Sequence, residues 1–300
     1  MNGVIVIDKP ADYTSFDVIA VVRKLTGQRR TGHTGTLDPN ATGVLPVLLG
    51  SATKAQDLIP NHDKDYVADF RLGLSTDTLD IWGKVLSEEK TDVSREEIES
   101  ALPAFRGEIT QIPPMYSAVK QNGQRLYDLA RKGVEVERKG RQVTVYRLEL
   151  NGFDRASQSG RLLVSCSKGT YVRTLIDDLG RALGTCAVMT ALRRTAACGF
   201  TLDDCVTLEQ LREMRDKGET EALLRPVDRL FSDYPQLSVS DAQAKRFCNG
   251  GSLDLSRTSL RDAAPAEGAQ YRVYHRERGF LGLGKVSDGE LKIGKLFPKA

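Results

Sequence analysis

The chain has 300 residues, of which 40% are hydrophobic and 28% charged, and its formal net charge is +3. This composition excludes a disordered, fibrous or membrane protein, and the length suits one large domain or two. The apolar runs are far shorter than the ~20 residues of a membrane-spanning helix, and the first of them follows no basic leader, so we expect a cytoplasmic protein. The mild positive charge does not by itself indicate nucleic-acid binding.

The first fifth of the chain predicts a strand, a helix and then a loop. Residues 4–7 (VIVI) indicate a short buried strand. Thr14 and Asp17 are spaced as a capping box, which begins a helix with one apolar face. Residues 32–43 (GHTGTLDPNATG) are predicted to be a loop. Residues 44–49 (VLPVLL) fit either a buried strand or the first turn of a core helix, because periodicity does not separate the two.

The middle of the chain alternates predicted strands with predicted amphipathic helices. Alternation of apolar and polar residues predicts strands over residues 66–72, 142–150 and 161–167. Capping residues and helical spacing predict helices over residues 94–105, 125–133, 170–184 and 207–218.

The last quarter of the chain has a different texture. A Pro-rich, polar stretch around residues 226–240 indicates a domain boundary. After a short predicted helix near residues 240–251, residues 270–297 hold short strands separated by glycines, which predicts a small β-rich module. We therefore expect two domains, residues 1–230 and 236–300.

Few side chains are arranged for chemistry. The three histidines, His33, His62 and His275, are widely separated and have no acid or cysteine at metal-ligand spacing, so we expect no metal. The five cysteines include no CxxC pair, which predicts free thiols. The common nucleotide-binding glycine loops are absent, so we expect no nucleotide cofactor. What remains is Asp38, which precedes Pro39 and on spacing alone fits an ordinary turn.

Seven segments, which follow one another in the order of a known family, favour a functional role for Asp38 over that of a turn residue. Residues 32–47 (GHTGTLDPNATGVLPV) resemble the signature loop G-H-x-G-[TA]-L-D-P of the TruB family of tRNA pseudouridine synthases. The segment IPPMYSAVK, which begins at residue 112, and the length of the chain resemble the bacterial stand-alone type of that family. The other similar segments are residues 8–18, 64–73, 76–80, 112–131, 167–180 and 191–196. Asp12 departs from the family, whose opening motif has glycine there. The tail resembles, more weakly, a PUA-type RNA-binding module, chiefly over residues 279–286 (GFLGLGKV).

The resemblance implies both a fold and a reaction. The fold is α+β: a pseudouridine-synthase catalytic domain with a mixed, mainly antiparallel central sheet flanked by helices, then a small β-rich PUA-like module. The reaction converts uridine 55 in the TΨC loop of tRNA into pseudouridine, without a cofactor or a metal. The C1′–N1 bond breaks, the freed uracil turns, and C5 bonds to C1′. One carboxylate suffices, because the detached base is itself the nucleophile and no water has to be activated.

The resemblance also implies roles for particular side chains. Asp38 is the expected catalytic residue, which either attacks the sugar carbon or takes the 2′ proton, and Arg173 is expected to pair with it. Tyr66 is expected to stack on the target uracil and to help remove the C5 proton. Tyr171 and Leu192 are expected to line the same pocket.

The expected partner is tRNA, bound through its T arm and acceptor stem by a monomeric protein. His33 would fill the space that the flipped base leaves, and Gly32 and Gly35 would allow close approach to the RNA. The C-terminal module would hold the acceptor stem. Basic residues at the rim of the pocket would neutralise phosphates, and the candidates are Lys9, Arg29, Arg30, Arg193 and Arg194.

Two other functions remain open at this point. The same chemistry serves guide-dependent pseudouridine synthases and enzymes that modify other RNAs. A protein with the same RNA-binding surface is also able to act as a tRNA-folding chaperone whose catalysis is dispensable.

Overall fold

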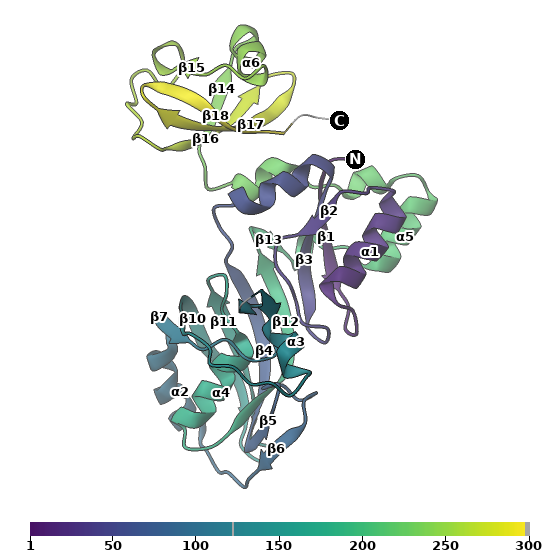
Figure 1. The fold of residues 1–300 in the computed structure, drawn as a ribbon, viewed down its shortest axis with the longest axis vertical. Coiled ribbons are helices and arrows are strands. Elements are labelled where there is room, and N and C mark those ends of the chain that lie inside the picture. The colour runs from purple at the N-terminus through teal and green to yellow at the C-terminus, as the bar shows by residue number, and fades with distance from the viewer. Residues whose placement is uncertain (122, 298–300) are drawn as a thin grey trace.

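Two β-sheets organise the protein, which we describe from a computed structural model over residues 1–121 and 123–297 (Figure 1). The first sheet contains β1 (Gly3–Lys9), β2 (Thr31–His33), β3 (Thr42–Leu49), β4 (Lys64–Leu72), β7 (Gly107–Gln111), β10 (Arg141–Asp154), β11 (Ser159–Cys166), β12 (Ala187–Ala197) and β13 (Phe200–Thr201). The second contains β14 (Gln236–Val239), β15 (Leu253–Asp254), β16 (Gln270–His275), β17 (Gly279–Ser287) and β18 (Glu290–Leu296). Two short hairpins pair β5 (Leu74–Thr76) with β6 (Val85–Glu88) and β8 (Lys120–Gln121) with β9 (Gln124–Arg125). The helices are α1 (Ser15–Thr26), α2 (Arg95–Ala101), α3 (Leu126–Ala130), α4 (Val172–Ala182), α5 (Leu208–Asp216) and α6 (Asp241–Cys248).

The first sheet follows the order β1-β3-β12-β4-β11-β10-β7, with β2 beside β3 and β13 beside β12. Strands β3 and β12 run parallel, whereas the other neighbours in this sheet run antiparallel. Helices α1 and α5 lie beside the β1 half, and α2 and α4 lie against the β10 and β4 half (Figure 1). The predicted α+β class with a mixed, mainly antiparallel sheet flanked by helices is confirmed. No helix in the described residues is long and apolar enough to cross a membrane.

Helix α1 begins and ends at the residues that its sequence indicates. The Thr14 hydroxyl accepts the backbone N–H of Asp17 at 3.1 Å, and the Asp17 carboxylate accepts the N–H of Thr14 at 2.8 Å. Gly27 ends the helix in the left-handed region, with φ +64°. The apolar face of the helix is buried with strands β1 and β3 and consists of Val18, Ile19, Val22 and Leu25.

The parallel contact between β3 and β12 requires a glycine. Arg194 of β12 lies opposite Gly43 of β3. Gly43 has φ +103°, and a Cβ at this position would lie 2.1 Å from the Arg194 carbonyl oxygen. The sequence singles out Gly32 and Gly35 of the same loop, but neither has a positive φ. The tightest backbone contact of the loop is therefore at its end, where it joins the sheet.

Three local predictions differ from the structure or are decided by it. Thr31–His33 form β2, so the predicted loop begins as a strand, because its backbone pairs with β3. Residues 44–49 belong to a strand and not to a helix, since each of them pairs with a residue of β1. The helix predicted over residues 125–133 is confined to Leu126–Ala130. The chain beyond it tightens into three-residue turns that end at Gly133, with φ +71°.

The second sheet is built from residues 236–296 and packs against the first part of the molecule. Its order is β14-β16-β17-β18-β15, so the predicted β-rich module is confirmed, with two strands upstream of those predicted. The Phe280 and Phe297 rings lie 6.3 and 5.6 Å from the ring of Phe231, which belongs to the connecting segment. The Tyr274 hydroxyl donates to Asp228 of the same segment at 2.5 Å. These contacts fix the module to the connecting segment.

Asp12 adopts the backbone conformation that a glycine would adopt without strain, with φ +63°. Aspartate enters the left-handed region more readily than most residues but at a greater cost than glycine. We expect Asp12→Gly to raise the free energy of unfolding by about 0.5–1 kcal/mol, as measured by urea denaturation. Asp12→Asn should stay within a few tenths of a kcal/mol of the parent, and Asp12→Val should be destabilised. A less stable glycine variant would contradict this explanation.

Candidate active site

Side chains of the preceding strand and helix hold the backbone of the loop that carries Asp38. The Lys9 ammonium, which is fully buried, donates to the carbonyl oxygens of Pro10 and Pro39, both at 2.8 Å. The buried Ser15 hydroxyl accepts the backbone N–H of Leu37 at 2.9 Å. Burial lowers the pKa of Lys9 to about 8, against the opposing effect of the nearby Asp38 carboxylate. These contacts bracket Asp38 from both sides along the chain.

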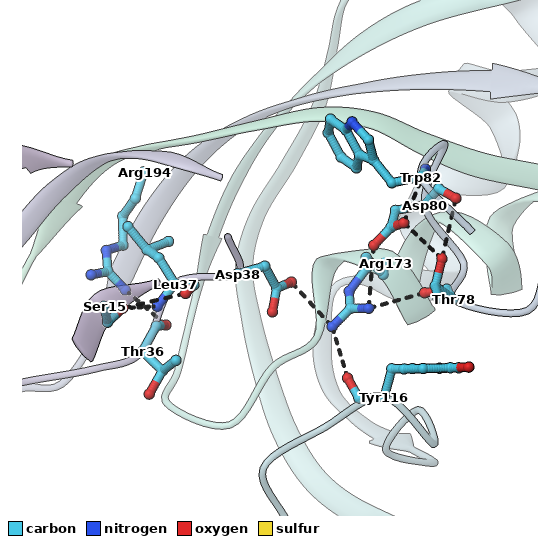
Figure 2. A network of polar contacts seen from close by, with 10 residues as sticks. All are labelled: Ser15, Thr36, Leu37, Asp38, Thr78, Asp80, Trp82, Tyr116, Arg173 and Arg194. Carbon is cyan, nitrogen blue, oxygen red and sulfur yellow. Dashed lines mark hydrogen bonds and ion pairs between the residues drawn. The ribbon is translucent and has the colours of Figure 1, made fainter. Parts of the chain in front are cut away.

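Arg194 holds the same loop from the neighbouring strand. It is fully buried, and its guanidinium donates to the carbonyl oxygens of Val44 at 2.7 Å, Gly35 at 3.1 Å and Thr36 at 3.4 Å. Figure 2 shows this side chain beside Ser15, Thr36 and Leu37. A guanidinium suits this place because its planar fork satisfies several buried carbonyl groups at once.

The predicted phosphate contacts are wrong for Lys9 and Arg194, whereas for Arg193, Arg29 and Arg30 they stay predictions. Lys9 and Arg194 are fully buried and donate to backbone carbonyls. Arg193 forms a two-point pair with the Asp8 carboxylate, at 3.1 and 2.8 Å. Arg29 and Arg30 are exposed, and they alone of the five keep an orientation toward solvent without an ion pair recorded in the described residues. The sequence identifies these residues as basic, but it does not indicate which of them are buried and therefore contact backbone carbonyl groups instead of RNA.

Asp38 is paired with Arg173, as the family resemblance implies. Arg173 Nη2 lies 3.1 Å from Asp38 Oδ2, and its Nη1 lies 3.3 Å from Asp80 Oδ2. The guanidinium also donates to the carbonyl oxygens of Tyr116 at 3.1 Å and Thr78 at 3.0 Å (Figure 2). The Arg173 side chain is 7% exposed, whereas that of Asp38 is 41% exposed. The arrangement is a rigid, buried cation that directs a carboxylate toward solvent.

Asp80 completes this network and was not among the site residues predicted. It lies in the segment TDTLD, which matches the family but suggests no role by itself. The Thr78 hydroxyl donates to Asp80 Oδ1 at 2.7 Å, and the other carboxylate oxygen faces Arg173. Asp80 and Arg173 are 93 residues apart, so no local pattern connects them. A carboxylate at the second side of the guanidinium fixes the direction in which Arg173 reaches Asp38.

The surroundings of Asp38 act on its pKa in opposite directions. Removal of water by the surrounding protein raises the pKa of Asp38, the Arg173 guanidinium lowers it, and the Asp80 carboxylate raises it. The net result is a pKa above the ordinary value of 3.8. The ionised form of this carboxylate is therefore more basic than an aspartate in water, and Arg173 is the neighbour that favours ionisation most strongly.

This direction sets a pH dependence for any reaction that needs ionised Asp38. The rate of a single turnover should fall about tenfold per pH unit once the pH drops below the pKa of Asp38. Because that pKa is raised, the fall should begin above the pH at which an ordinary aspartate is protonated. Arg173→Gln should move this limb to higher pH, because the guanidinium that lowers the pKa is gone. A limb that stays in place in Arg173→Gln would show that it belongs to another group.

Two of the other predicted residues meet in one buried cluster beside the loop. Tyr66 of β4 and Leu192 of β12 are each 8% exposed and belong to the same apolar cluster as Leu37. Tyr171 precedes α4, where its backbone N–H donates to Gln111 Oε1 at 2.9 Å and its carbonyl accepts from Gln111 Nε2 at 3.2 Å. Burial raises the pKa of Tyr66 to about 12, so this phenol is neutral in the free protein.

His33 lies on β2 and is not a member of the apolar cluster that contains Tyr66 and Leu192. It ends β2, and its ring meets the ring of Phe16 edge to face, with the centroids 5.9 Å apart. Its Nδ1 is buried and has no hydrogen-bond partner within the described residues. Burial lowers the pKa of His33, with a further contribution from Arg194. Within residues 1–121 and 123–297, no group of three or more histidine, cysteine or acidic side chains is placed to hold a metal ion.

Comparisons with known proteins cover nearly the whole chain. Residues 23–172 match the family described as TruB family pseudouridylate synthase (N terminal domain), residues 173–232 the tRNA pseudouridylate synthase B C-terminal domain, and residues 235–297 pseudouridine synthase II TruB, C-terminal. The protein named tRNA pseudouridine synthase B from Chromobacterium violaceum is 46% identical, over 97% of this chain and 93% of its own length. The one from Clostridium tetani is 42% identical, over 99% of both. A solved Cbf5-Nop10-Gar1 complex contains a chain that superposes with a TM-score of 0.75 at 26% identity, over 99% of this chain and 85% of its own.

Proposed function

The chain belongs to the TruB family of pseudouridylate synthases, and from this premise we propose that Asp38 catalyses the isomerisation of uridine 55, in the TΨC loop of tRNA, to pseudouridine. The protein is an enzyme, an isomerase that acts on uridine in tRNA. The observation that carries the role of Asp38 is its pair with a buried Arg173, which leaves the carboxylate partly exposed beside an apolar cluster.

The chemistry requires one carboxylate at the sugar and a place for the base. Ionised Asp38 either attacks C1′ or removes the 2′ proton, and in both routes the C1′–N1 bond breaks and uracil is released within the pocket. The uracil turns and C5 bonds to C1′, which displaces the Asp38 carboxylate in the first route and takes the 2′ proton back from Asp38 in the second. C5 then loses its proton and N1 gains one, so the product is an isomer of the substrate. Arg173 favours the ionised form of Asp38 and directs it, and the raised pKa of Asp38 strengthens the ionised carboxylate as a nucleophile or a base.

The buried residues beside the loop suit a flipped base. We assign stacking on the target uracil to Tyr66, and apolar lining of the pocket to Leu192 and Tyr171. With a pKa of about 12, Tyr66 stacks as a neutral phenol, and it has to lose its own proton before it accepts one from C5. His33, which carries a buried nitrogen without a partner in the described residues, would fill the gap left in the RNA.

The remaining parts of the assignment concern how tRNA is held. Exposed Arg29 and Arg30 would contact phosphates of the T arm, which makes the affinity fall as salt rises. We assign the acceptor stem to a C-terminal domain of residues 236–300, and catalysis to residues 1–230. We expect a monomer in the cytoplasm, where tRNA is modified. The substrate itself is tRNA, as for the named relatives.

The guide-dependent alternative is not favoured. The named relatives at 42–46% identity are tRNA pseudouridine synthases and match over nearly the full length of this chain. The similarity to the Cbf5 chain is lower, at 26% identity. The alternative of another RNA as target is decided by the test below.

The function is tested by mapping pseudouridine in a tRNA transcript after incubation with the pure protein alone, in the presence of EDTA. Pseudouridine is detected by chemical labelling and the resulting mass shift. We expect modification at the T-loop uridine and nowhere else in the transcript. A transcript with that uridine replaced by cytidine should remain unlabelled. Modification at another position, or a requirement for a guide RNA, would overturn the specificity assigned.

A further inference from the structure

Trp82 is the one tryptophan in the sequence, and it is placed unusually. It lies in the turn between β5 and β6, and 51% of its surface is exposed. Tryptophan is a large apolar side chain that is usually at least partly covered. Among the described residues, no aromatic ring packs against this indole. The ring therefore keeps an open face.

Hydrogen bonds within the turn and to the neighbouring strand β12 fix the backbone that carries Trp82. The Asp77 N–H donates to the carbonyl of Lys84 at 3.1 Å, and the Lys84 N–H donates to the Asp77 carboxylate at 2.8 Å. The Ile81 N–H donates to the carbonyl of Met189, in β12, at 2.9 Å. The exposed indole is thus displayed from a fixed backbone. A rigid aromatic side chain contacts a partner at low cost in conformational entropy.

The turn is also continuous with the candidate active site. The backbone N–H of Trp82 donates to Asp80 Oδ1 at 3.2 Å. Asp80 in turn contacts Arg173, which contacts Asp38. Figure 2 shows the indole projecting from the Asp80 turn beside this network. When an RNA loop places one nucleotide at Asp38, the neighbouring nucleotides lie against the protein surface next to it. Lys84, exposed two residues further on, offers a positive charge to the same backbone.

We propose that Trp82 is a stacking platform for an unpaired base of the T arm next to the target uridine. This inference rests on the proposed function. Flipping a base out of a loop leaves its neighbours without a stacking partner, and single-stranded RNA is commonly held by stacking on aromatic rings. Ile81, Val85 and Leu86 are also exposed on this hairpin, so binding of a protein or of a second copy is an outcome that the test has to separate. We favour a nucleobase because the indole adjoins the Asp80 network and has the charge of Lys84 beside it.

The single tryptophan makes the contact directly observable. Tryptophan fluorescence of the Asp38→Asn protein, titrated with tRNA transcript, should fall in a saturable way as the base covers the indole. A separate T-arm stem-loop should give the same quenching, since the contact lies in that arm. Fluorescence that stays constant at saturating tRNA, with binding verified by a filter assay, would overturn the proposal. So would quenching that depends on protein concentration without RNA, which indicates self-association.

Variants separate stacking from general apolar contact. Trp82→Leu should weaken stem-loop binding by roughly 5- to 150-fold, the range for loss of one stacked base, and should raise KM accordingly. Trp82→Phe should recover most of that affinity. Leu86→Ala, on the same hairpin and 65% exposed, is the matched control and should bind as the parent does. Equal affinity of the leucine and phenylalanine variants would contradict stacking.

The two claims fail separately in these experiments. If the parent protein forms no pseudouridine but its fluorescence is quenched by the stem-loop, the proposed function fails and the Trp82 contact stands. If it forms pseudouridine at the T-loop uridine without quenching, the function stands and the Trp82 contact is refuted.

Discussion

Replacing Asp38 by asparagine is expected to lower the single-turnover rate of pseudouridine formation by a factor on the order of 10⁴ or more. Asparagine has nearly the same shape, but it neither attacks C1′ nor accepts the 2′ proton. The Asp38 side chain is partly exposed, and its replacement removes only one of the contacts that Arg173 makes. The fold and the binding of tRNA should therefore persist. The measurement is tritium release from tRNA labelled at C5 of uridine.

The same variant separates catalysis from RNA folding. Binding of tRNA by Asp38→Asn should stay within a few-fold of the parent protein, which shows that the loss is chemical. Asp80→Asn is the companion variant, since it perturbs the direction of Arg173 but leaves Asp38 in place. Product formation by Asp38→Asn at the parent rate would remove Asp38 from the mechanism. Refolding of misfolded tRNA by the inactive variant would show that chaperone action accompanies catalysis.

The second large effect is expected at Arg194, which touches neither Asp38 nor, in our assignment, the RNA. Arg194→Met leaves the buried carbonyl groups of Gly35, Thr36 and Val44 without their donor. Each such loss typically costs about 1–3 kcal/mol, partly offset because a buried charge is also removed, so we expect a net loss of roughly 3 kcal/mol in the free energy of unfolding. A displacement of the loop by about 1 Å would lower the rate about 100-fold.

Arg193→Met is the matched control for this variant. Arg193 is adjacent in the same strand, but its pair with Asp8 is partly exposed, and such pairs contribute about 0–1 kcal/mol. Urea denaturation should therefore separate the two methionine variants clearly. Arg194→Lys should recover part of the stability but less of the activity, since an ammonium does not reproduce the fork. If Arg194→Met affected tRNA affinity alone, Arg194 would be an RNA contact after all.

The sequence predicts those parts of the protein that depend on neighbours along the chain. The capping box of α1, the αL glycine that ends it and the alternation of β4 are local patterns, and the structure contains all three. The pairing of Asp38 with Arg173 was predicted from the family resemblance and not from spacing. The roles of Tyr66, Tyr171, Leu192 and His33 stay predictions, although the structure gathers Tyr66 and Leu192 beside the loop.

What the sequence does not reveal depends on contacts between distant segments. Asp80 reaches Arg173 across 93 residues, and nothing near either residue indicates the other. Lys9 and Arg194 were misassigned to phosphates because a basic residue in a loop-rich region is usually exposed. Here the loop has too few internal hydrogen bonds to satisfy its own carbonyls, so charged donors are drawn inside to supply them.

The aromatic contacts of the C-terminal sheet affect how the chain can be divided. Leu283 of β17 and Phe297, which follows β18, belong to the same buried cluster as Val4, Phe200 and Phe231, so the C-terminal sheet completes part of the core of the N-terminal sheet. Removing the C-terminal module would expose that apolar surface to water and favour aggregation. The two domains that are apparent along the sequence therefore share part of one hydrophobic core and depend on each other for stability. The contribution of the module to tRNA binding is better measured by replacing single exposed residues than by truncating the chain.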